Sequence, residues 1–237
     1  MNVGVVTGAR RGMGAACAIR LRNTVDELIE VDLPDDISDA ATVAALAREV
    51  AARGNFRFLV HCAGLSPTMA EPRRIVEVNL LGTVYLLDAF APLVRADSVA
   101  VCFASTAGHY PIDVMGDPRD ADFFDANAAM LTDPGLAYAF SKRAVLQECQ
   151  RAAQRWGKAG GRVVTVSPGV INTTMGQREF ARQPIMRGMV EHSALGRMGT
   201  ADEVAAVAAF LVSDEASFVT GVDLRVDGGE GASQSAG

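Results

Sequence analysis

The sequence predicts a single α/β domain built on a doubly wound parallel sheet. A short apolar run over residues 3–7 leads directly into the glycine-rich stretch 7–14, and a helix-like run follows. A second apolar run ends at Asp32, and strand-like and helix-like runs continue to alternate beyond it. Strands that alternate with helices through short loops form a parallel sheet with helices on both faces. Because no repeat, linker or second core is evident, one domain is expected over residues 1–229.

Each element of the N-terminal half has a local reason. The glycine turn opens the first helix, Ser38 or Asp39 can cap the second, and Gly54 can end it. Pro72 suits the start of a long apolar helix. Strands are expected over residues 3–7, 27–32, 58–62 and 98–104, and helices over residues 12–23, 40–52 and 73–95.

The C-terminal half continues the alternation around two unusual segments. Residues 109–133 are polar and rich in Pro and Asp, with room for a short helix. Residues 174–198, rich in Met, Phe and Arg, are expected to form a mobile cover over a substrate. Strands are expected over residues 162–167 and 222–226, helices over residues 136–156 and 201–212, and a flexible tail over residues 230–237.

The composition argues against several classes of function. The 237 residues carry a net charge of −6, which disfavours a nucleic-acid partner. No apolar run reaches the roughly 18 residues of a transmembrane helix, so neither a transmembrane helix nor membrane association is expected. The four cysteines and three histidines are scattered, and we expect no metal site. Widely spaced thiols and a first strand that begins at the N-terminus lead us to expect a cytoplasmic protein.

The glycine-rich stretch has the form of a phosphate-binding turn. Gly8, Gly12 and Gly14 allow a tight turn, close approach of a pyrophosphate and packing of the helix on the strand. The N–H groups at the start of the helix and its positive dipole end favour phosphate. The stretch therefore predicts a dinucleotide cofactor.

The choice of dinucleotide depends on the end of the second strand. Asp32 can accept hydrogen bonds from both ribose hydroxyls and should repel a 2′-phosphate, which favours NAD. Arg10 and Arg11 lie in the glycine turn, where a base can attract that phosphate. We expect NAD, with NADP as the less favoured cofactor.

A tyrosine and a lysine share one face of the helix at 136–156. Tyr138 and Lys142 are four residues apart, and the chain contains only one other lysine, Lys158. An ammonium group near the phenol should lower the pKa of Tyr138 and make it a usable acid or base near neutral pH. The pair predicts proton transfer to or from a substrate.

Three further polar residues are expected to join this pair. Ser105 and Thr173 follow predicted strands, whose carboxyl ends face the ligand crevice of such a sheet. Asn79 lies inside an apolar helix, where its amide needs a hydrogen-bond partner. The hydroxyl of Ser105 can hold a substrate oxygen.

Taken together, these motifs resemble those of the short-chain dehydrogenase/reductase family, which has a Rossmann-type fold. The family's TGxxxGxG motif matches residues 7–14, its Pro-Gly motif matches residues 168–169, and its C-terminal Asp-Gly-Gly matches residues 227–229. Its catalytic residues match Asn79, Ser105, Tyr138 and Lys142. The resemblance implies that the cofactor contacts Gly8, Arg10, Arg11, Gly12, Met13, Gly14, Asp32, Asp36, Ile37, Ala63, Gly64, Tyr138, Lys142, Pro168, Gly169, Ile171 and Thr173.

The chain departs from the family pattern in four places, one of which is a short loop between Gly64 and Asn79. Residues 61–64 read His-Cys-Ala-Gly where the family often has Asn-Asn-Ala-Gly, and residues 32–36 are too few for the usual helix and third strand. Residues 109–133 are inserted between Ser105 and Tyr138. This combination is similar to the bacterial 3α-hydroxysteroid dehydrogenase/carbonyl reductase branch, which implies steroid or small aromatic carbonyl substrates.

The sequence thus predicts an NAD-dependent enzyme that interconverts a hydrophobic secondary alcohol, such as a hydroxysteroid, and its ketone. His109, Tyr110, Met175 and Phe180 are candidates for an apolar substrate pocket, although they could equally pack the cover onto the body. The alternatives are a dehydrogenase of aryl or allylic alcohols and a non-catalytic nucleotide-binding regulatory protein. A homo-oligomer is expected, and the insertion beside a long helix favours a dimer over a tetramer.

Overall fold

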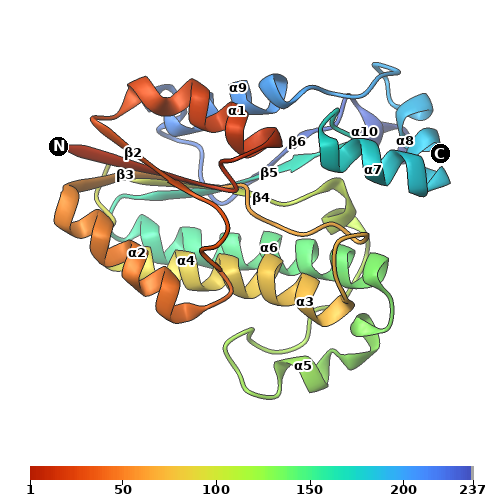
Figure 1. The fold of residues 1–237 in the computed structure, drawn as a ribbon, viewed down its shortest axis with the longest axis horizontal. Coiled ribbons are helices and arrows are strands. Elements are labelled where there is room, and N and C mark those ends of the chain that lie inside the picture. Colours follow the sequence, from red (N-terminus) through yellow and green to blue (C-terminus); the bar gives the residue numbers. More distant parts are fainter. Residues whose placement is uncertain (236–237) are drawn as a thin grey trace.

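The computed structural model of the chain describes residues 1–235 and contains the predicted parallel sheet (Figure 1). The six strands lie in the order β2-β1-β3-β4-β5-β6, and every neighbouring pair is parallel. Their bounds are β1 (Asn2–Thr7), β2 (Glu27–Val31), β3 (Asn55–His61), β4 (Val99–Phe103), β5 (Arg162–Pro168) and β6 (Asp223–Val226). The order reverses direction between β1 and β3, and a crevice for ligands is expected there, beyond the carboxyl ends of the strands.

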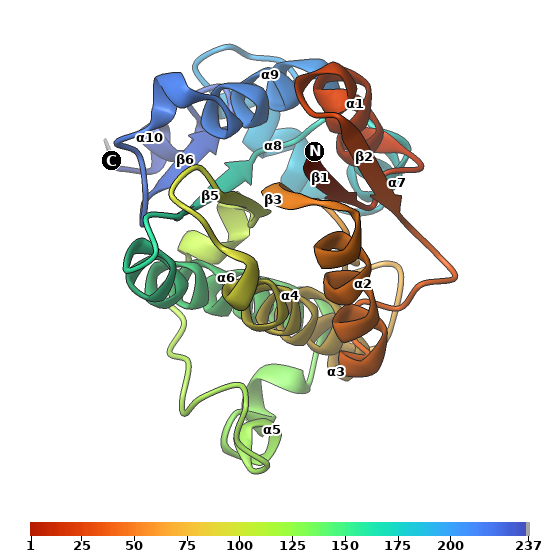
Figure 2. The same cartoon turned by 90° about the vertical axis from the view of Figure 1, so that its left-hand side faces the viewer.

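Helices cover both faces of the sheet (Figure 2). On one face α2 (Ala40–Arg53), α3 (Pro72–Val76), α4 (Gly82–Phe90) and α6 (Pro134–Gly157) enclose the larger hydrophobic core. On the other, α1 (Gly12–Leu21) packs against α9 (Ala201–Val212) over a second core. Asp39, one of the two expected caps, caps α2. Thr200 forms a capping box with Glu203 at the start of α9. The predicted fold class is therefore confirmed.

The helix expected over residues 73–95 is modified near its middle. A π-helical turn, Glu77–Leu81, separates α3 from α4, and a 3₁₀ turn, Ala91–Leu93, follows α4. Pro72–Leu93 is long and apolar enough to cross a membrane by length and composition alone, contrary to the expectation from the sequence. However, 61% of its apolar 18-residue stretch is buried, and the helices pack on α2 and α6. Its apolar side chains form part of the domain core.

The cover and the C-terminal tail contain more regular structure than expected. Residues 174–198 contain two helices, α7 (Thr174–Arg182) and α8 (Pro184–His192). The segment expected to be a flexible tail forms a short helix, α10 (Glu230–Ser235), and residues 236–237 lie outside the described part of the chain. Gly228 and Gly229, both with positive φ, turn the chain from β6 into α10.

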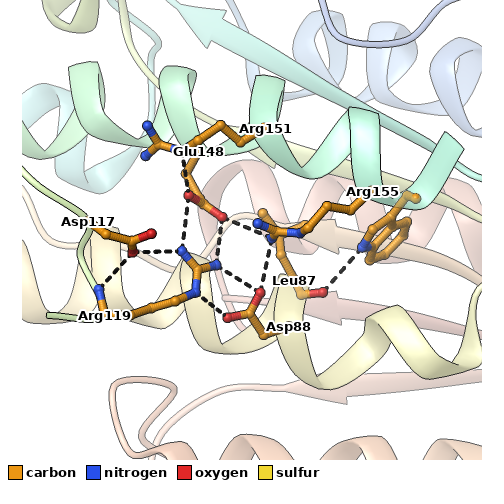
Figure 3. A network of polar contacts seen from close by, with 8 residues as sticks. Leu87, Asp88, Asp117, Arg119, Glu148, Arg151 and Arg155 are labelled. Atoms are coloured by element: carbon orange, nitrogen blue, oxygen red, sulfur yellow. Dashed lines mark hydrogen bonds and ion pairs between the residues drawn. The ribbon is translucent and has the colours of Figure 1, made fainter. Parts of the chain in front are cut away.

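The segment 109–133 stands out from the body beside α4 and α6 (Figure 2) and contains the short helix α5 (Phe123–Ala126). Arg119 anchors it, donating to Asp88 on α4 at 2.7 and 2.8 Å and to Glu148 on α6 at 2.7 Å. Arg151 and Arg155 also donate to Glu148, at 3.1 and 3.0 Å (Figure 3). The insertion is thus tied to α4 through Asp88 and to α6 through the buried carboxylate of Glu148.

Replacing Glu148 by Gln is expected to lower the free energy of unfolding by about 2 kcal/mol at neutral pH. The side chain of Glu148 is 0% exposed. Burial would raise the pKa of Glu148, but hydrogen bonds from Arg119 and Arg155 hold it below its usual value. A lowered folded pKa stabilises the fold above the unfolded pKa of about 4.3, and this contribution is lost as the pH falls through the folded value.

Urea unfolding of both proteins at neutral and at strongly acidic pH measures this effect. The difference between wild type and Glu148→Gln should shrink as the pH falls, and a difference that is independent of pH would contradict the assignment. Glu49→Gln is the matched control, because Glu49 pairs with Arg53 on the exposed surface of α2 and should change stability by less than about 1 kcal/mol.

Candidate active site

The predicted glycine turn lies at the carboxyl end of β1. Gly8 and Gly12 have φ values of +68° and +59°, which L-residues with a side chain rarely adopt. A Cβ atom at Gly14 would lie 2.0 Å from the carbonyl oxygen of Gly8, so α1 packs on the turn only with glycine there. A Cβ atom at Gly12 would meet nothing closer than Thr173, at 3.6 Å. The turn therefore leaves backbone exposed at a helix N-terminus, which fits the pyrophosphate of a dinucleotide.

Asp32 follows β2 and stands beside this turn. Its carboxylate accepts hydrogen bonds from the backbone N–H groups of Arg10, at 2.9 Å, and Leu33, at 2.8 Å. The guanidinium of Arg10 donates to the carbonyl oxygen of Leu33 at 2.8 Å. Of the residues expected near adenine, Asp36 pairs with Arg74 at 2.6 Å, and Ile37 is buried.

Asn79 and Lys142 meet at Gly64, on the other side of the crevice. A Cβ atom at Gly64 would lie 3.0 Å from Asn79 Oδ1 and 3.6 Å from Lys142 Nζ. Asn79, in the π-helical turn, accepts from the N–H of Leu65 at 2.8 Å and donates to Ser141 Oγ at 3.1 Å. Lys142 Nζ donates to the carbonyl oxygen of Phe103, at the end of β4, at 2.8 Å. The glycine at 64 therefore leaves the space in which these groups converge.

Tyr138 and Ser105 complete the cluster. Ser105 follows β4 and caps the 3₁₀ turn Thr106–His109, where its Oγ accepts from the N–H of Ala107 at 3.2 Å. Burial raises the pKa of Tyr138, a hydrogen bond with Ser105 lowers it, and the charge of Glu179 raises it. The net effect is a raised pKa, so in this structure the phenol is a proton donor rather than a phenolate.

The expected effect of Lys142 on Tyr138 is not seen. The ammonium is directed to the carbonyl oxygen of Phe103 and lies 5.9 Å from the centre of the Tyr138 ring. Burial lowers the pKa of Lys142 itself to about 8. Ser105, rather than Lys142, is the group that lowers the pKa of the phenol, because its hydroxyl makes the direct hydrogen bond.

His61 has a role that the sequence did not reveal. Its Nδ1 lies 2.7 Å from Thr7 Oγ1, and its Nε2 lies 3.1 Å from Thr83 Oγ1. Because Thr83 donates its proton to the carbonyl oxygen of Asn79 at 2.7 Å, Nε2 must donate to Thr83, and Nδ1 accepts from Thr7. Burial lowers the pKa of His61 to about 3, so the ring stays neutral. The departure from Asn-Asn-Ala-Gly was visible in the sequence, but the partners of His61 were not.

A cleft of about 290 Å³ opens above Ser105 and Tyr138. Tyr110 and Met175 line it, as expected. Much of its wall comes from the cover and from the segment after β5. Among its lining residues are Met13, Pro168, Gly169, Val170, Ile171, Thr173, Gly176, Met186 and Met189. The cleft therefore joins the expected cofactor residues to an apolar chamber.

Two of the proposed substrate residues lie elsewhere. His109 is turned toward β5 and β6, where its Nε2 lies 2.9 Å from Asp223 Oδ2 and 3.3 Å from Ser167 Oγ. Phe180 does not line the cleft, and its ring lies 6.0 Å from the guanidinium carbon of Arg187. Neither residue therefore lines this cleft, because local sequence does not show which face of a short turn or helix points inward.

Comparison with known proteins identifies relatives of this chain. A family model described as enoyl-(acyl carrier protein) reductase matches residues 124–230. The short-chain dehydrogenase/reductase bsc3 of Alternaria brassicicola is 32% identical over 213 residues, which cover 82% of this chain and 75% of that protein. The 3-alpha-hydroxysteroid dehydrogenase/carbonyl reductase of Comamonas testosteroni is 29% identical over an alignment of 247 residues. This alignment covers 97% of this chain and 96% of that protein.

The fold also matches a solved structure over its full length. The crystal structure of the 3-alpha-hydroxysteroid dehydrogenase from Pseudomonas sp. B-0831, complexed with NADH, superposes with a TM-score of 0.84. It is 29% identical in sequence, and the match covers 100% of this chain and 99% of that one.

Proposed function

This chain belongs to the short-chain dehydrogenase/reductase family of oxidoreductases, and on that premise we propose that it interconverts a secondary alcohol and a ketone with NAD as cofactor. One observation carries the proposal most directly. Asn79, Ser105, Tyr138 and Lys142, which come from three separate segments, converge beside the glycine turn at the carboxyl ends of the strands. A protein that only bound nucleotide would not need this set.

Each of the four residues has a proposed role. The bound nicotinamide supplies hydride transfer. Tyr138 exchanges the proton of the substrate hydroxyl, and Ser105, hydrogen-bonded to it, orients the substrate oxygen. Lys142 binds the ribose hydroxyls of the cofactor. Asn79 fixes the backbone of Leu65 at the edge of the crevice.

Asp32→Ala is expected to improve the use of NADP relative to NAD. The carboxylate of Asp32 stands at the end of β2, where it would accept from a free 2′-hydroxyl and repel a 2′-phosphate. At an effective dielectric constant of about 20, removing one such charge should raise the ratio of kcat/KM with NADP to kcat/KM with NAD by roughly 10- to 100-fold. Asp35→Ala removes a neighbouring exposed carboxylate and is the control. An unchanged ratio in Asp32→Ala would exclude Asp32 as the selector.

The apolar chamber supports a hydrophobic substrate such as a hydroxysteroid. Its methionines are adaptable, and three of the four line the cleft from α7 and α8. The alternative is an aryl or allylic alcohol. A panel of 3-hydroxysteroids, benzylic and cinnamyl alcohols, and simple cyclic alcohols, assayed with NAD and NADP, separates the two. Turnover of none of them, with NAD still bound, would favour the non-catalytic alternative.

We also propose that the protein is cytoplasmic and forms a homo-oligomer, with a dimer favoured over a tetramer. The support for the dimer is the position of residues 109–133. They stand beside α4 and α6 and are anchored to both helices by Arg119, so they limit access to that side of the long helices.

A further inference from the structure

One charged side chain lines the cleft, apart from the ammonium of Lys142 at the base of the adjoining crevice. Among the residues that line it, within the described range 1–235, Glu179 is the only acidic or basic one. Its side chain extends from α7, on the cover, and the residue is 5% exposed. A lone carboxylate in an otherwise uncharged, largely apolar chamber is unusual enough to require an explanation.

Glu179 is surrounded by neutral donors. Its Oε1 accepts from Ser66 Oγ at 2.5 Å, from the hydroxyl of Thr68, and from the N–H of Thr68 at 3.4 Å. Its Oε2 accepts from the side-chain amide of Gln183. Within residues 1–235 no lysine, arginine or histidine makes an ion pair with it. Its hydrogen bonds are satisfied, but its charge is not neutralised.

The charge acts on whatever enters the cleft. It already acts on Tyr138, where it contributes to the raised pKa of the phenol. Consider a substrate whose anionic group lies about 8 Å from the carboxylate of Glu179. At an effective dielectric constant of about 20, it would bind roughly 30-fold more weakly than a neutral substrate of the same shape. A positive charge would be attracted by the same field.

We propose that Glu179 is a specificity-determining residue that excludes anionic substrates, so that the enzyme acts on a neutral or cationic alcohol or ketone. The inference rests on the proposed function, and it adds a constraint of charge to the apolar character of the cleft. Hydroxy acids and phosphorylated alcohols are poor substrates on this account. Specificity arises here from a repulsive element as much as from attractive contacts.

The test uses three aryl ketones of nearly the same shape and different charge. These are 4-acetylbenzamide, which is neutral, 4-acetylbenzoate, which is anionic, and 4-acetylbenzamidine, which is cationic. Their binding to the NADH-bound protein is measured by calorimetry. In the wild type we expect the benzoate to bind roughly 30-fold more weakly than the benzamide, and the benzamidine at least as tightly as the benzamide.

Variants separate the charge of Glu179 from its hydrogen bonds to Ser66 and Thr68. Glu179→Gln keeps the size of the side chain and one acceptor oxygen for Ser66 and Thr68. It should reduce the gap in affinity between benzoate and benzamide to within about threefold. Glu179→Asp keeps the charge and should retain most of the gap. Glu191→Gln removes an exposed carboxylate from α8 and should leave the gap unchanged.

Two results would overturn the inference: equal binding of benzoate and benzamide to the wild type, or a gap that persists in Glu179→Gln. The second result would mean that Glu179 only ties α7 to the loop at residues 66–68. Failure of all three ketones to bind the wild type also overturns it. If Glu179→Gln does not fold, the order in which the three ketones bind to the wild type, from tightest to weakest, decides the test. Discrimination in binding without NADH oxidation by any ketone would count against the proposed function instead.

Discussion

Tyr138→Phe should reduce kcat by roughly 10²- to 10⁴-fold and leave the affinity for NADH nearly unchanged. The substitution keeps the ring and removes only the hydroxyl that is hydrogen-bonded to Ser105. Steady-state kinetics and the fluorescence of bound NADH measure the two quantities. Because the phenol has a raised pKa, it is protonated at neutral pH, the state in which it can donate a proton to a ketone.

Tyr85→Phe is the matched control for this prediction. Tyr85 lies on α4 and packs against the larger core, away from the cleft. Near-normal turnover by Tyr138→Phe would remove Tyr138 from the proposed chemistry. A parallel loss of turnover and NADH binding would instead indicate that the substitution disturbs the crevice as a whole.

Lys142→Met should reduce kcat/KM by roughly 10²-fold or more and raise the KM for NAD. Its ammonium is buried at the base of the crevice, where it donates to the carbonyl oxygen of Phe103 and faces the space left by Gly64. Burial lowers the pKa of Lys142 to about 8, so its positive charge is present below that pH and is lost above it. In the wild type, kcat/KM should therefore fall as the pH rises through about 8, and the variant should lack this decrease.

Lys158→Met provides the control, because Lys158 is the only other lysine and is exposed after the end of α6. Circular dichroism of each variant checks that the fold is intact. A decrease near pH 8 that survives in Lys142→Met would show that another group titrates there.

Much of the fold and the central cluster could be predicted because their signals are local. The glycine turn needs positive φ at two positions and a close approach at a third, and all three requirements are carried by neighbouring residues. Tyr138 and Lys142 share a helix face through their spacing alone. Ser105 and Thr173 follow strands, and strand ends meet at one edge of a parallel sheet.

The features that were missed depend on pairing between distant segments. The orientation of the His109 ring is set by Asp223 on β6. Which ring nitrogen of His61 carries the proton is set by Thr7 and Thr83. The anchoring of residues 109–133 depends on carboxylates of α4 and α6, whose facing positions no local pattern specifies. The raised pKa of Tyr138 likewise comes from burial and from Glu179, which belongs to the cover.

Transfer of deuterium from the C4 position of deuterated NADH to a ketone tests the central claim most directly. The protein is incubated with the labelled cofactor and ketones matching the proposed substrate classes, and the alcohols formed are analysed by mass spectrometry. The account predicts an alcohol that carries one deuterium at the carbinol carbon, formed by the wild type and not by Tyr138→Phe. Binding of NADH without any labelled alcohol from these classes would contradict it and favour a nucleotide-binding protein without this activity.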